Sequence, residues 1–526
     1  MAHHDHDHDQ YLGDTKLKVI DTDQISPPKG SVPTTTLPIT FFDIFQLFNE
    51  LKVLFFYEYP YTTSHFLETI LPCLKQSLSF TLQHFFPFAA NLVIPSKPNK
   101  PHIHYVADAA SVLFTVAEST VDFDQLVDDH PRDSKHMELF MPEKPPASNL
   151  EDGTRVFPIM AIQVTVMSNS GFCIAINHQH VVADGMAFML FMKWWTSNCK
   201  RLIINKTSPG EEEWKNYPMP IFNDGAMVQD PNGVDIELSF LNFWWKVISS
   251  FATDKSKSKS ESESESGSGS GSGSGSSDAM HENTRADTAK VKATFKFNQI
   301  QVDKLKHWIS LKYYACNSTE SQDLKEKKEL EEEEEEPLRL STFTVTCALM
   351  WICLLKSGDN TNSEDGDELH HFVFLADCRG RYEFSSIPST YFGNFVAPIA
   401  VTLKRRMLIG ENGIIEAAKV IRNKIKELEK DGVLKGAETW MQDVVEKTIL
   451  GRSVVVAGSP KLGMYETDFG VGRPKKCASV GNNDSMSFTL FDCKDKNLGG
   501  IEVVVPLSRT QLDSFNKILQ QSLKIL

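Results

Sequence analysis

Residues 159–196 read IMAIQVTVMSNSGFCIAINHQHVVADGMAFMLFMKWWT, and this stretch decides the fold. Residues 159–167 and 172–177 are apolar and rich in β-branched side chains, which predicts two strands. The turn residues at 168–171 predict that these strands form a hairpin. Residues 185–196 are apolar almost throughout and predict a buried helix. A strand, a turn, a strand and a helix in this order indicate an α/β layer.

Strands and helices also alternate in the rest of the chain. Residues 63–82 have apolar side chains at helical spacing, which predicts an amphipathic helix whose buried face carries Phe66, Ile70, Leu74 and Leu78. The second half predicts further elements: strands at 291–297 and 371–376, helices at 302–311, 342–356 and 415–430, a strand–turn–strand at 485–506, and a last helix at 508–524. We therefore expect an α/β fold with two domains.

Composition sets the expected domain boundaries. We expect a disordered His/Asp-rich tail at 1–15, a first domain at 16–225, and a crossover with a Ser/Gly/Lys/Glu-rich linker at 226–290. A second domain is expected at 291–526. Within it, residues 319–336 end in six consecutive Glu residues, which predicts an acidic surface loop.

The charge balance narrows the class of partner. The chain has 54 Lys and Arg residues against 69 Asp and Glu residues, a net charge of −15. An acidic chain lacks the basic face that nucleic acid or an anionic membrane surface requires. The chain also has no apolar run of the ~18 residues that a membrane-spanning helix needs. We expect neither nucleic acid nor a membrane as a partner.

The N-terminus and the cysteines indicate a reducing compartment. The first residues, MAHHDHDHDQ, are polar and do not resemble a signal peptide. The nine cysteines form no Cys-x-x-Cys pair, which favours free thiols and a cytoplasmic location. No zinc-type Cys/His spacing occurs. We expect no bound metal, and we interpret the His/Asp tract at residues 3–9 as part of the disordered tail, with weak binding of a divalent metal by this tract as the alternative.

The candidate chemistry centres on His180 and Asp184. The pattern His-x-x-x-Asp also occurs at 3–7 and 104–108, so the spacing alone carries little weight. At His180, however, the pattern follows an apolar strand and precedes Gly185 and an apolar helix. A histidine at a strand end is suited to act as a general base near neutral pH. The same residues equally fit a core histidine followed by a helix-capping Asp, and no Gly-x-Ser-x-Gly motif supports an acyl-enzyme.

Two motifs carry a resemblance to a known family. His180-Val-Val-Ala-Asp184-Gly185 resembles the His-x-x-x-Asp-Gly signature of the plant BAHD acyl-CoA-dependent acyltransferases. Near the C-terminus, Asp468-Phe469-Gly470-Val471-Gly472 resembles their Asp-Phe-Gly-Trp-Gly motif, with Val471 where the family usually has Trp.

Three further segments resemble the middle motifs of the same family, at 341–344, 376–381 and 391–394. The sequence Tyr-Phe-Gly-Asn at 391–394, together with Gly-Ser-Pro at 458–460, is similar to the clade that acylates sugars of anthocyanins and other phenolic glycosides. That clade usually continues with Cys, whereas this chain has Phe395.

The resemblance implies a fold and a set of roles. The fold would be two chloramphenicol-acetyltransferase-like domains, each a mixed β-sheet with flanking helices, joined by a crossover and enclosing a solvent channel. His180 would be the general base, and Asp184 would orient its loop. Ser459 would donate a hydrogen bond to the oxyanion. Residues 468–472 would form a structural loop near the CoA side.

Other residues are candidates for binding or support. We expect Asp377 and Arg381 to form a buried ion pair. The candidate contacts to substrate or CoA are Ser341, Thr342, Tyr391, Asn394 and Arg473.

The implied function is acyl-CoA-dependent O-acylation of a sugar hydroxyl on an anthocyanin, flavonoid or other phenolic glycoside. The donor would be hydroxycinnamoyl- or malonyl-CoA, used as a co-substrate by a monomer without a bound cofactor. A malonyl carboxylate requires a nearby cation, and no Lys or Arg follows Asp184 before Lys193, which favours a hydroxycinnamoyl or neutral aliphatic donor. Two alternatives are a catalytically weak or inactive ligand-binding relative and an acyl-CoA hydrolase.

Overall fold

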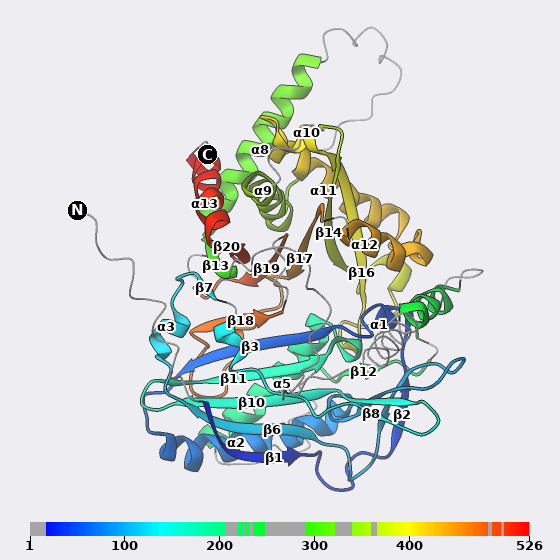
Figure 1. Ribbon diagram of the computed structural model, residues 1–526, viewed down its shortest axis with the longest axis vertical. Helices are drawn as coiled ribbons and strands as arrows, with labels where there is room; N and C mark the ends of the chain where they lie inside the picture. Colours follow the sequence, from blue (N-terminus) through cyan, green and yellow to red (C-terminus); the bar gives the residue numbers. More distant parts are fainter. Residues whose placement is uncertain are drawn as a thin grey trace, which may run out of the picture.

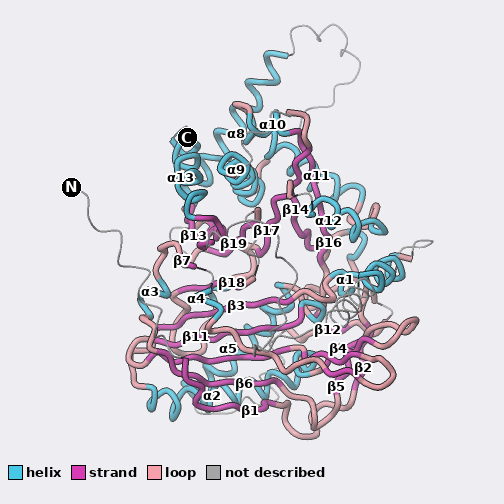
Figure 2. The backbone as a smooth tube through the Cα atoms, in the orientation of Figure 1, coloured by secondary structure: helices cyan, strands magenta, loops and turns pink. Residues whose placement is uncertain are grey.

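Two large β-sheets, each covered by helices, make up two lobes that lie one above the other (Figures 1 and 2). The structure is a computed structural model. It describes residues 17–133, 135–205, 218–225, 227–228, 230, 235–247, 290–320, 339–358, 366–449, 451–481, 486–495 and 499–524. The expected α/β fold with two sheet-based units is confirmed.

The lower lobe in Figure 1 is built on a six-stranded mixed sheet. Its strands, in spatial order, are β1 (Leu17–Ile25), β6 (Val112–Ser119), β10 (Met160–Met167), β11 (Gly171–Gln179), β3 (Glu50–Glu58) and β18 (Lys476–Val480). Two long helices, α2 (Thr63–His84) and α5 (Gly185–Asn205), pack on one face of this sheet.

The predicted hairpin and the predicted amphipathic helix are both confirmed. Strands β10 and β11 pair antiparallel, from Met160 opposite His178 to Met167 opposite Gly171. Every residue of both strands is buried, because helices cover one face of the sheet and other chain segments cover the second face. Helix α2 begins after Thr62, whose side chain accepts a hydrogen bond from the amide of His65, and it buries the predicted apolar face.

A smaller five-stranded sheet completes the lower lobe. Its strands, in spatial order, are β2 (Thr35–Pro38), β5 (His102–Tyr105), β4 (Asn91–Ile94), β9 (Arg155–Pro158) and β8 (Ser148–Asn149). The short helices of this lobe are α1 (Phe41–Phe45), α3 (Phe123–Val127) and α4 (Lys135–Glu138).

The upper lobe is built on a seven-stranded mixed sheet. Its strands, in spatial order, are β16 (Val396–Lys404), β14 (Leu369–Asp377), β17 (Ser453–Gly458), β19 (Ser487–Asp492), β20 (Ile501–Ser508), β13 (Lys290–Phe297) and β7 (Arg132–Asp133). Its helices are α8 (Gln299–Glu320), α9 (Thr342–Ser357), α10 (Arg405–Ile409), α11 (Gly413–Asp431), α12 (Trp440–Ile449) and α13 (Arg509–Lys524). Every strand and helix predicted for the second half is present, with somewhat different bounds.

Two strands cross between the lobes. Strand β18 follows the second sequence motif but pairs with β3 in the lower sheet, whereas β7 comes from the first half and pairs with β13 in the upper sheet. A parallel pair of β12 (Ile221–Phe222) and β15 (Tyr391–Phe392) also joins the two halves of the chain. The expected boundaries at 16–225 and 291–526 stay a prediction, but they do not describe these exchanged strands.

Several expectations fall outside the described residues. These are the tail at 1–15, most of the linker within 226–290, and residues 321–336 of the expected acidic loop. Among the described helices, none combines the length and the apolar character that crossing a membrane requires.

Candidate active site

His180 lies where β11 ends beside the upper lobe. The strand runs to Gln179, a short 3₁₀ turn covers His180–Val182, and α5 begins at Gly185. The amide of His180 donates a hydrogen bond of 2.8 Å to the carbonyl of Asn49, which fixes the backbone at the strand end. The imidazole is half-buried, unlike the fully buried side chains of β11. The predicted placement of His180 at the sheet edge is therefore confirmed.

Asp184 is buried and holds the turn in two ways. Its Oδ1 accepts a hydrogen bond of 3.0 Å from the amide of Ala187, as a capping residue does at the start of a helix. Its Oδ2 lies 2.7 Å from the Arg379 guanidinium and accepts a hydrogen bond of 2.9 Å from the amide of Phe395. The first contact belongs to α5 and the other two belong to the upper lobe. Asp184 therefore ties the end of the His180 turn to both lobes.

The expected ion pair between Asp377 and Arg381 is wrong. Arg381 donates to the backbone carbonyl of Asp377, and the Asp377 carboxylate, which is about half exposed, contacts Arg379 instead. The buried pair is Arg379 with Asp184, whose side chains are 5% and 2% exposed. Arg379 also donates to the carbonyls of Tyr391 and Gly393. The turn after β14 therefore directs Arg379, and not Arg381, toward Asp184.

Asn394 orients the His180 ring. Its side-chain nitrogen donates to the His180 carbonyl (2.7 Å) and to Asp43 Oδ1 (3.0 Å), and both of these partners are oxygen atoms that only accept hydrogen bonds. The amide oxygen of Asn394 must therefore face His180 Nδ1, at 2.9 Å. Nδ1 then carries the proton and Nε2 keeps its lone pair. No described residue hydrogen-bonds to Nε2, so this nitrogen is available as a base.

Asp43 anchors Asn394 from the lower lobe. It lies in α1, where its carboxylate also accepts hydrogen bonds from the amide and hydroxyl of Thr40, at 2.8 Å each. The backbone amide of Asn394 donates to Asp43 as well, at 2.9 Å. Burial raises the pKa of Asp43, and these hydrogen bonds oppose that effect. The network from Thr40 to His180 therefore joins segments 351 residues apart in the chain.

Burial lowers the pKa of His180 below its ordinary value. Three contacts act to raise this pKa: a hydrogen bond to the backbone, the negative charge of Asp184 and the hydrogen bond with Asn394. The effect of burial is larger than their sum. Because its nearest side-chain partner is a neutral amide, the imidazole stays unprotonated at neutral pH. A neutral imidazole is the form that accepts a proton.

Two candidate substrate contacts are not open to a ligand. Asn394 is fully buried, and its side chain is committed to His180 and Asp43. Tyr391 is 1% exposed and packs against Arg379 and Phe395. Both residues support the site from the protein interior, because they are buried where the two lobes meet.

The second motif docks on the same helix, α5. Asp468 Oδ1 accepts hydrogen bonds from the amides of Gly470 (2.8 Å) and Gly472 (2.9 Å), and its Oδ2 lies 2.6 Å from Lys200 Nζ. Both glycines have φ near +100°, a conformation that side-chain-bearing residues rarely adopt. The Asp468 carboxylate thus closes a tight loop and attaches it to α5.

Phe469 anchors this loop in the core. Its ring is fully buried and meets the rings of Trp195 and Tyr57 edge-on, with centroids 4.9 and 5.6 Å away. Val471, which replaces the usual Trp of the family motif, is half-buried and packs at the edge of the same core. The large aromatic anchor of the loop is therefore Phe469.

The remaining candidates lie at the surface. Ser459 is half-buried, and its hydroxyl oxygen accepts a hydrogen bond from the amide of Lys461. Ser341 is exposed and caps α9 by accepting from the amide of Thr344, and Thr342 is half-buried beside it. Arg473 is exposed. The contacts of these four residues neither assign nor exclude a ligand.

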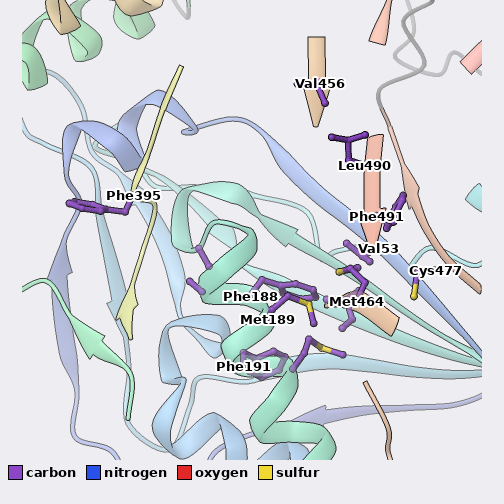
Figure 3. Close-up of a cluster of buried hydrophobic side chains, with 14 of the residues drawn as sticks. Val53, Phe188, Met189, Phe191, Phe395, Val456, Met464, Cys477, Leu490 and Phe491 are labelled. Carbon is purple, nitrogen blue, oxygen red and sulfur yellow. The ribbon is translucent and has the colours of Figure 1, made fainter. Parts of the chain in front are cut away.

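An apolar cluster surrounds the start of α5. Figure 3 shows Phe188, Met189 and Phe191 on the helix, with Val456 and Leu490 of the upper sheet in the same view. The described residues contain no cluster of His, Cys, Asp and Glu side chains that could hold a metal ion. The site therefore combines apolar side chains at the start of α5 with an imidazole nitrogen that has no hydrogen-bond partner in the described part of the chain.

Comparison with known proteins identifies the family. A model described as Transferase family matches residues 15–229 and 243–521, which is most of the chain. The chain belongs to this family, the BAHD acyltransferases. It is an acyl-CoA-dependent acyltransferase, as the two sequence motifs predicted.

Curated relatives match over nearly the full length. A coumaroyl-CoA:anthocyanidin 3-O-glucoside-6''-O-coumaroyltransferase of Arabidopsis thaliana is 36% identical and covers 96% of this chain and 97% of its own. A malonyl-coenzyme A:anthocyanin 3-O-glucoside-6''-O-malonyltransferase of Dahlia pinnata is 33% identical and covers 97% and 98%. BAHD relatives of this chain therefore include enzymes with either donor.

Solved structures support the fold. Vinorine synthase aligns with a TM-score of 0.58 at 16% identity, covering 95% of this chain and 96% of its own. The TRI101 protein of F. sporotrichioides, solved with coenzyme A and T-2, aligns with a TM-score of 0.57 at 14% identity, covering 91% and 96%. At these identities the likeness shows the fold alone.

Sequence reasoning missed the positioning role of Asn394 and did not identify Asp43 or Arg379 as site residues. One signal was present for Asp43, because it is an acidic residue inside the apolar run ITFFDIF. An acid in such a run is buried and needs partners. The identity of those partners depends on contacts across the lobes that no local pattern contains.

Proposed function

We propose that this BAHD enzyme transfers a hydroxycinnamoyl or malonyl group from acyl-CoA to a sugar hydroxyl of an anthocyanin, flavonoid or other phenolic glycoside. One observation carries the proposal: His180 lies at the join between the lobes, with Nδ1 held by Asn394 and Nε2 without a hydrogen-bond partner among the residues that the structure describes. The acceptor class is supported by the relatives that act on anthocyanin and phenolic glucosides.

The geometry suits direct transfer in a ternary complex. His180 Nε2 removes the proton from the acceptor hydroxyl while the oxygen attacks the thioester carbonyl carbon. The C–S bond then breaks, and the imidazolium returns the proton to the CoA thiolate. The products are an ester and free CoA. Asp184, Arg379 and Asn394 are positioning residues in this scheme, because they hold the turn and the ring without reaching the reacting atoms.

Ser459 is our proposed oxyanion donor. Its hydroxyl oxygen accepts one hydrogen bond, from the amide of Lys461, and its own proton is not donated to any described residue. Three residues further on, Leu462 lies against Gly185: a Cβ built at Gly185 would stand 3.1 Å from the Leu462 side chain. The Ser459 turn therefore lies close to the start of α5. Ser341, Thr342 and Arg473 are proposed contacts to CoA.

The side chains at the start of α5 favour an aromatic or neutral aliphatic donor over a malonyl donor. Met186 is partly exposed, Ala187 and Phe188 are buried, and none of the three can pair with a malonyl carboxylate.

We also infer a cytoplasmic monomer. The eight cysteines with described side chains are all free thiols, which supports a reducing compartment. The monomeric state is proposed from the absence of an exposed heptad pattern in the sequence.

A transfer assay tests the proposed function. Purified protein is incubated with p-coumaroyl-, caffeoyl-, acetyl- or malonyl-CoA and a panel of anthocyanin and flavonol glucosides, and products are measured by mass spectrometry. We expect an acylated glucoside with at least one pair and a loss of ~10³-fold in kcat for His180→Ala. His104→Ala is the matched control, because His104 belongs to another His-x-x-x-Asp stretch and its ring hydrogen-bonds to Thr36, which is not part of the Thr40–Asp43–Asn394–His180 network.

Two results would contradict the proposal. Equal product from wild type and His180→Ala would show that His180 is not the base. Release of free CoA without an acceptor, at a rate equal to that with one, would show that the enzyme is a hydrolase.

A further inference from the structure

A cavity of about 900 Å³ lies beside the strand end that carries His180. Its walls come from β3, β11, the segment after α4 and the end of β18, so both halves of the chain contribute. This volume is in the range of small-molecule sites. The residues relevant to recognition are Phe48, Glu50, Lys144, Phe157, Asn177 and Gln179.

Asn177 is the unusual group in this wall. Its side chain is 5% exposed, and its Oδ1 has no hydrogen-bond partner among the described residues. A buried polar atom left unpaired is unfavourable because it loses its hydrogen bonds to water, so its presence in this wall indicates a partner that arrives from outside. Gln179, two residues further along the same face of β11, is also buried at 9% exposure and lines the cavity.

The charges of the cavity disfavour an anionic ligand. Glu50 pairs with Lys144 at 2.5 Å and with Lys52 at 3.0 Å. Burial acts to raise the pKa of Glu50, but the attraction of the two lysines is larger, so this pKa lies below its ordinary value. The carboxylate therefore stays charged. The described lining contains one more carboxylate than ammonium groups: Glu50, Glu138 and Glu143 against Lys52 and Lys144. CoA phosphates and a malonyl carboxylate would be poorly matched here.

A sugar on an aromatic aglycone fits the same lining well. Amide and carboxylate groups such as those of Asn177, Gln179 and Glu50 hydrogen-bond to neutral hydroxyls. Phe48 and Phe157, whose ring centroids are 6.4 Å apart, form an apolar part of the wall. The cavity therefore combines a polar floor with an aromatic side.

The cavity lining reaches Gln179, the residue next to His180, although His180 itself is not part of the lining. Gln179 immediately precedes His180, and Glu50 lies opposite Gln179 in the strand pairing. The carbonyl of Asn49, next to Glu50, accepts the hydrogen bond from the His180 amide. A sugar held by Asn177 and Gln179 would therefore lie along the strand that ends at His180.

We propose that this cavity is the sugar subsite of the acceptor and that Asn177 Oδ1 accepts a hydrogen bond from a sugar hydroxyl other than the one acylated. This inference rests on the proposed function, because it takes the acceptor to be a phenolic glycoside. Asn177 is then a specificity-determining residue, and the acyl-CoA lies elsewhere between the lobes.

The test compares wild type with Asn177→Leu, which keeps the volume and removes the acceptor atom. We expect KM for kaempferol 3-O-glucoside to rise at least 10-fold, with KM for p-coumaroyl-CoA and kcat unchanged. The 2-, 3- and 4-deoxyglucosides of kaempferol identify the hydroxyl, since one of them should bind wild type 10-fold more weakly and show no further loss with Asn177→Leu. Asn99→Leu is the control, because Asn99 is exposed and does not line the cavity.

A binding measurement tests the sugar subsite independently of the acyl-transfer reaction. Titration calorimetry of kaempferol 3-O-glucoside without acyl-CoA should show the same weakening in Asn177→Leu, or in Asn177→Ala if the first variant does not fold. Unchanged glucoside binding, or an increase in KM for acyl-CoA instead, would overturn the sugar subsite. Glucoside binding that depends on Asn177 without any transfer would contradict only the proposed function.

Discussion

Two loops centred on aspartates join the lobes through α5, and they are held by different forces. In the first loop, Asp184 pairs with Arg379 of the upper lobe, and the two side chains are 2% and 5% exposed. In the second loop, Asp468 pairs with Lys200 of α5, and the side chains are 24% and 47% exposed. Both aspartates also accept backbone hydrogen bonds that close a turn. The pairs are alike in chemistry and unlike in burial.

Burial decides what each pair contributes. Half-exposed ion pairs contribute little, about 0–1 kcal/mol, so the second loop depends on the buried ring of Phe469. Forming a buried ion pair requires both charges to lose their hydration, which is unfavourable. Removing one partner, however, leaves the other charge buried without compensation. The first loop therefore tolerates no loss of charge, and it is the loop that carries His180, the proposed base.

Removing the ring of Phe469 should have the largest effect on stability. We expect Phe469→Ala to lower the free energy of unfolding by about 4 kcal/mol, because the ring leaves a cavity beside Trp195 and Tyr57. Urea denaturation measures this change. The neighbouring Val471→Ala, at a half-buried position, should cost about 1 kcal/mol. Equal costs would show that the second loop is not anchored by its aromatic residue.

Neutralising the buried aspartate, Asp184, should have the second-largest effect on stability. We expect Asp184→Asn to destabilise the protein by about 3 kcal/mol, because Arg379 would keep only the half-exposed Asp377 as a charged partner. The rate of acyl transfer should also fall, since the turn that carries His180 loses its tie to the upper lobe. Denaturation and kcat are measured on the same samples. A variant with wild-type stability would contradict the structural role of this pair.

Neutralising the more exposed aspartate, Asp468, should have the smallest effect on stability. Asp468→Asn keeps an oxygen that accepts from Gly470 and Gly472 and loses only the pair with Lys200. We expect a cost of about 1 kcal/mol or less, reduced further in 0.5 M salt. A cost as large as that of Asp184→Asn would remove the distinction between the two loops.

The sequence predicted the layers and the position of His180 because both depend on local patterns. The hairpin, α5 and the placement of His180 at a strand end follow from apolar periodicity and one turn. The choice between Arg379 and Arg381 did not follow, because both lie in one hexapeptide and only the backbone path after β14 separates them. The role of Asn394 depends on Asp43, which no local pattern links to it.

The central claim is that a neutral amide, rather than a carboxylate, holds the ring of His180. The pH dependence of kcat/KM for the glucoside, at saturating acyl-CoA, tests it directly. Burial lowers the pKa of His180 from its ordinary value of 6.5, so the imidazole stays neutral and active at lower pH than a free histidine would. We expect kcat/KM to rise with pH along a limb whose midpoint lies below 6.5. A midpoint above 6.5 would contradict the account, because it would place a negative charge, rather than Asn394, beside the imidazole.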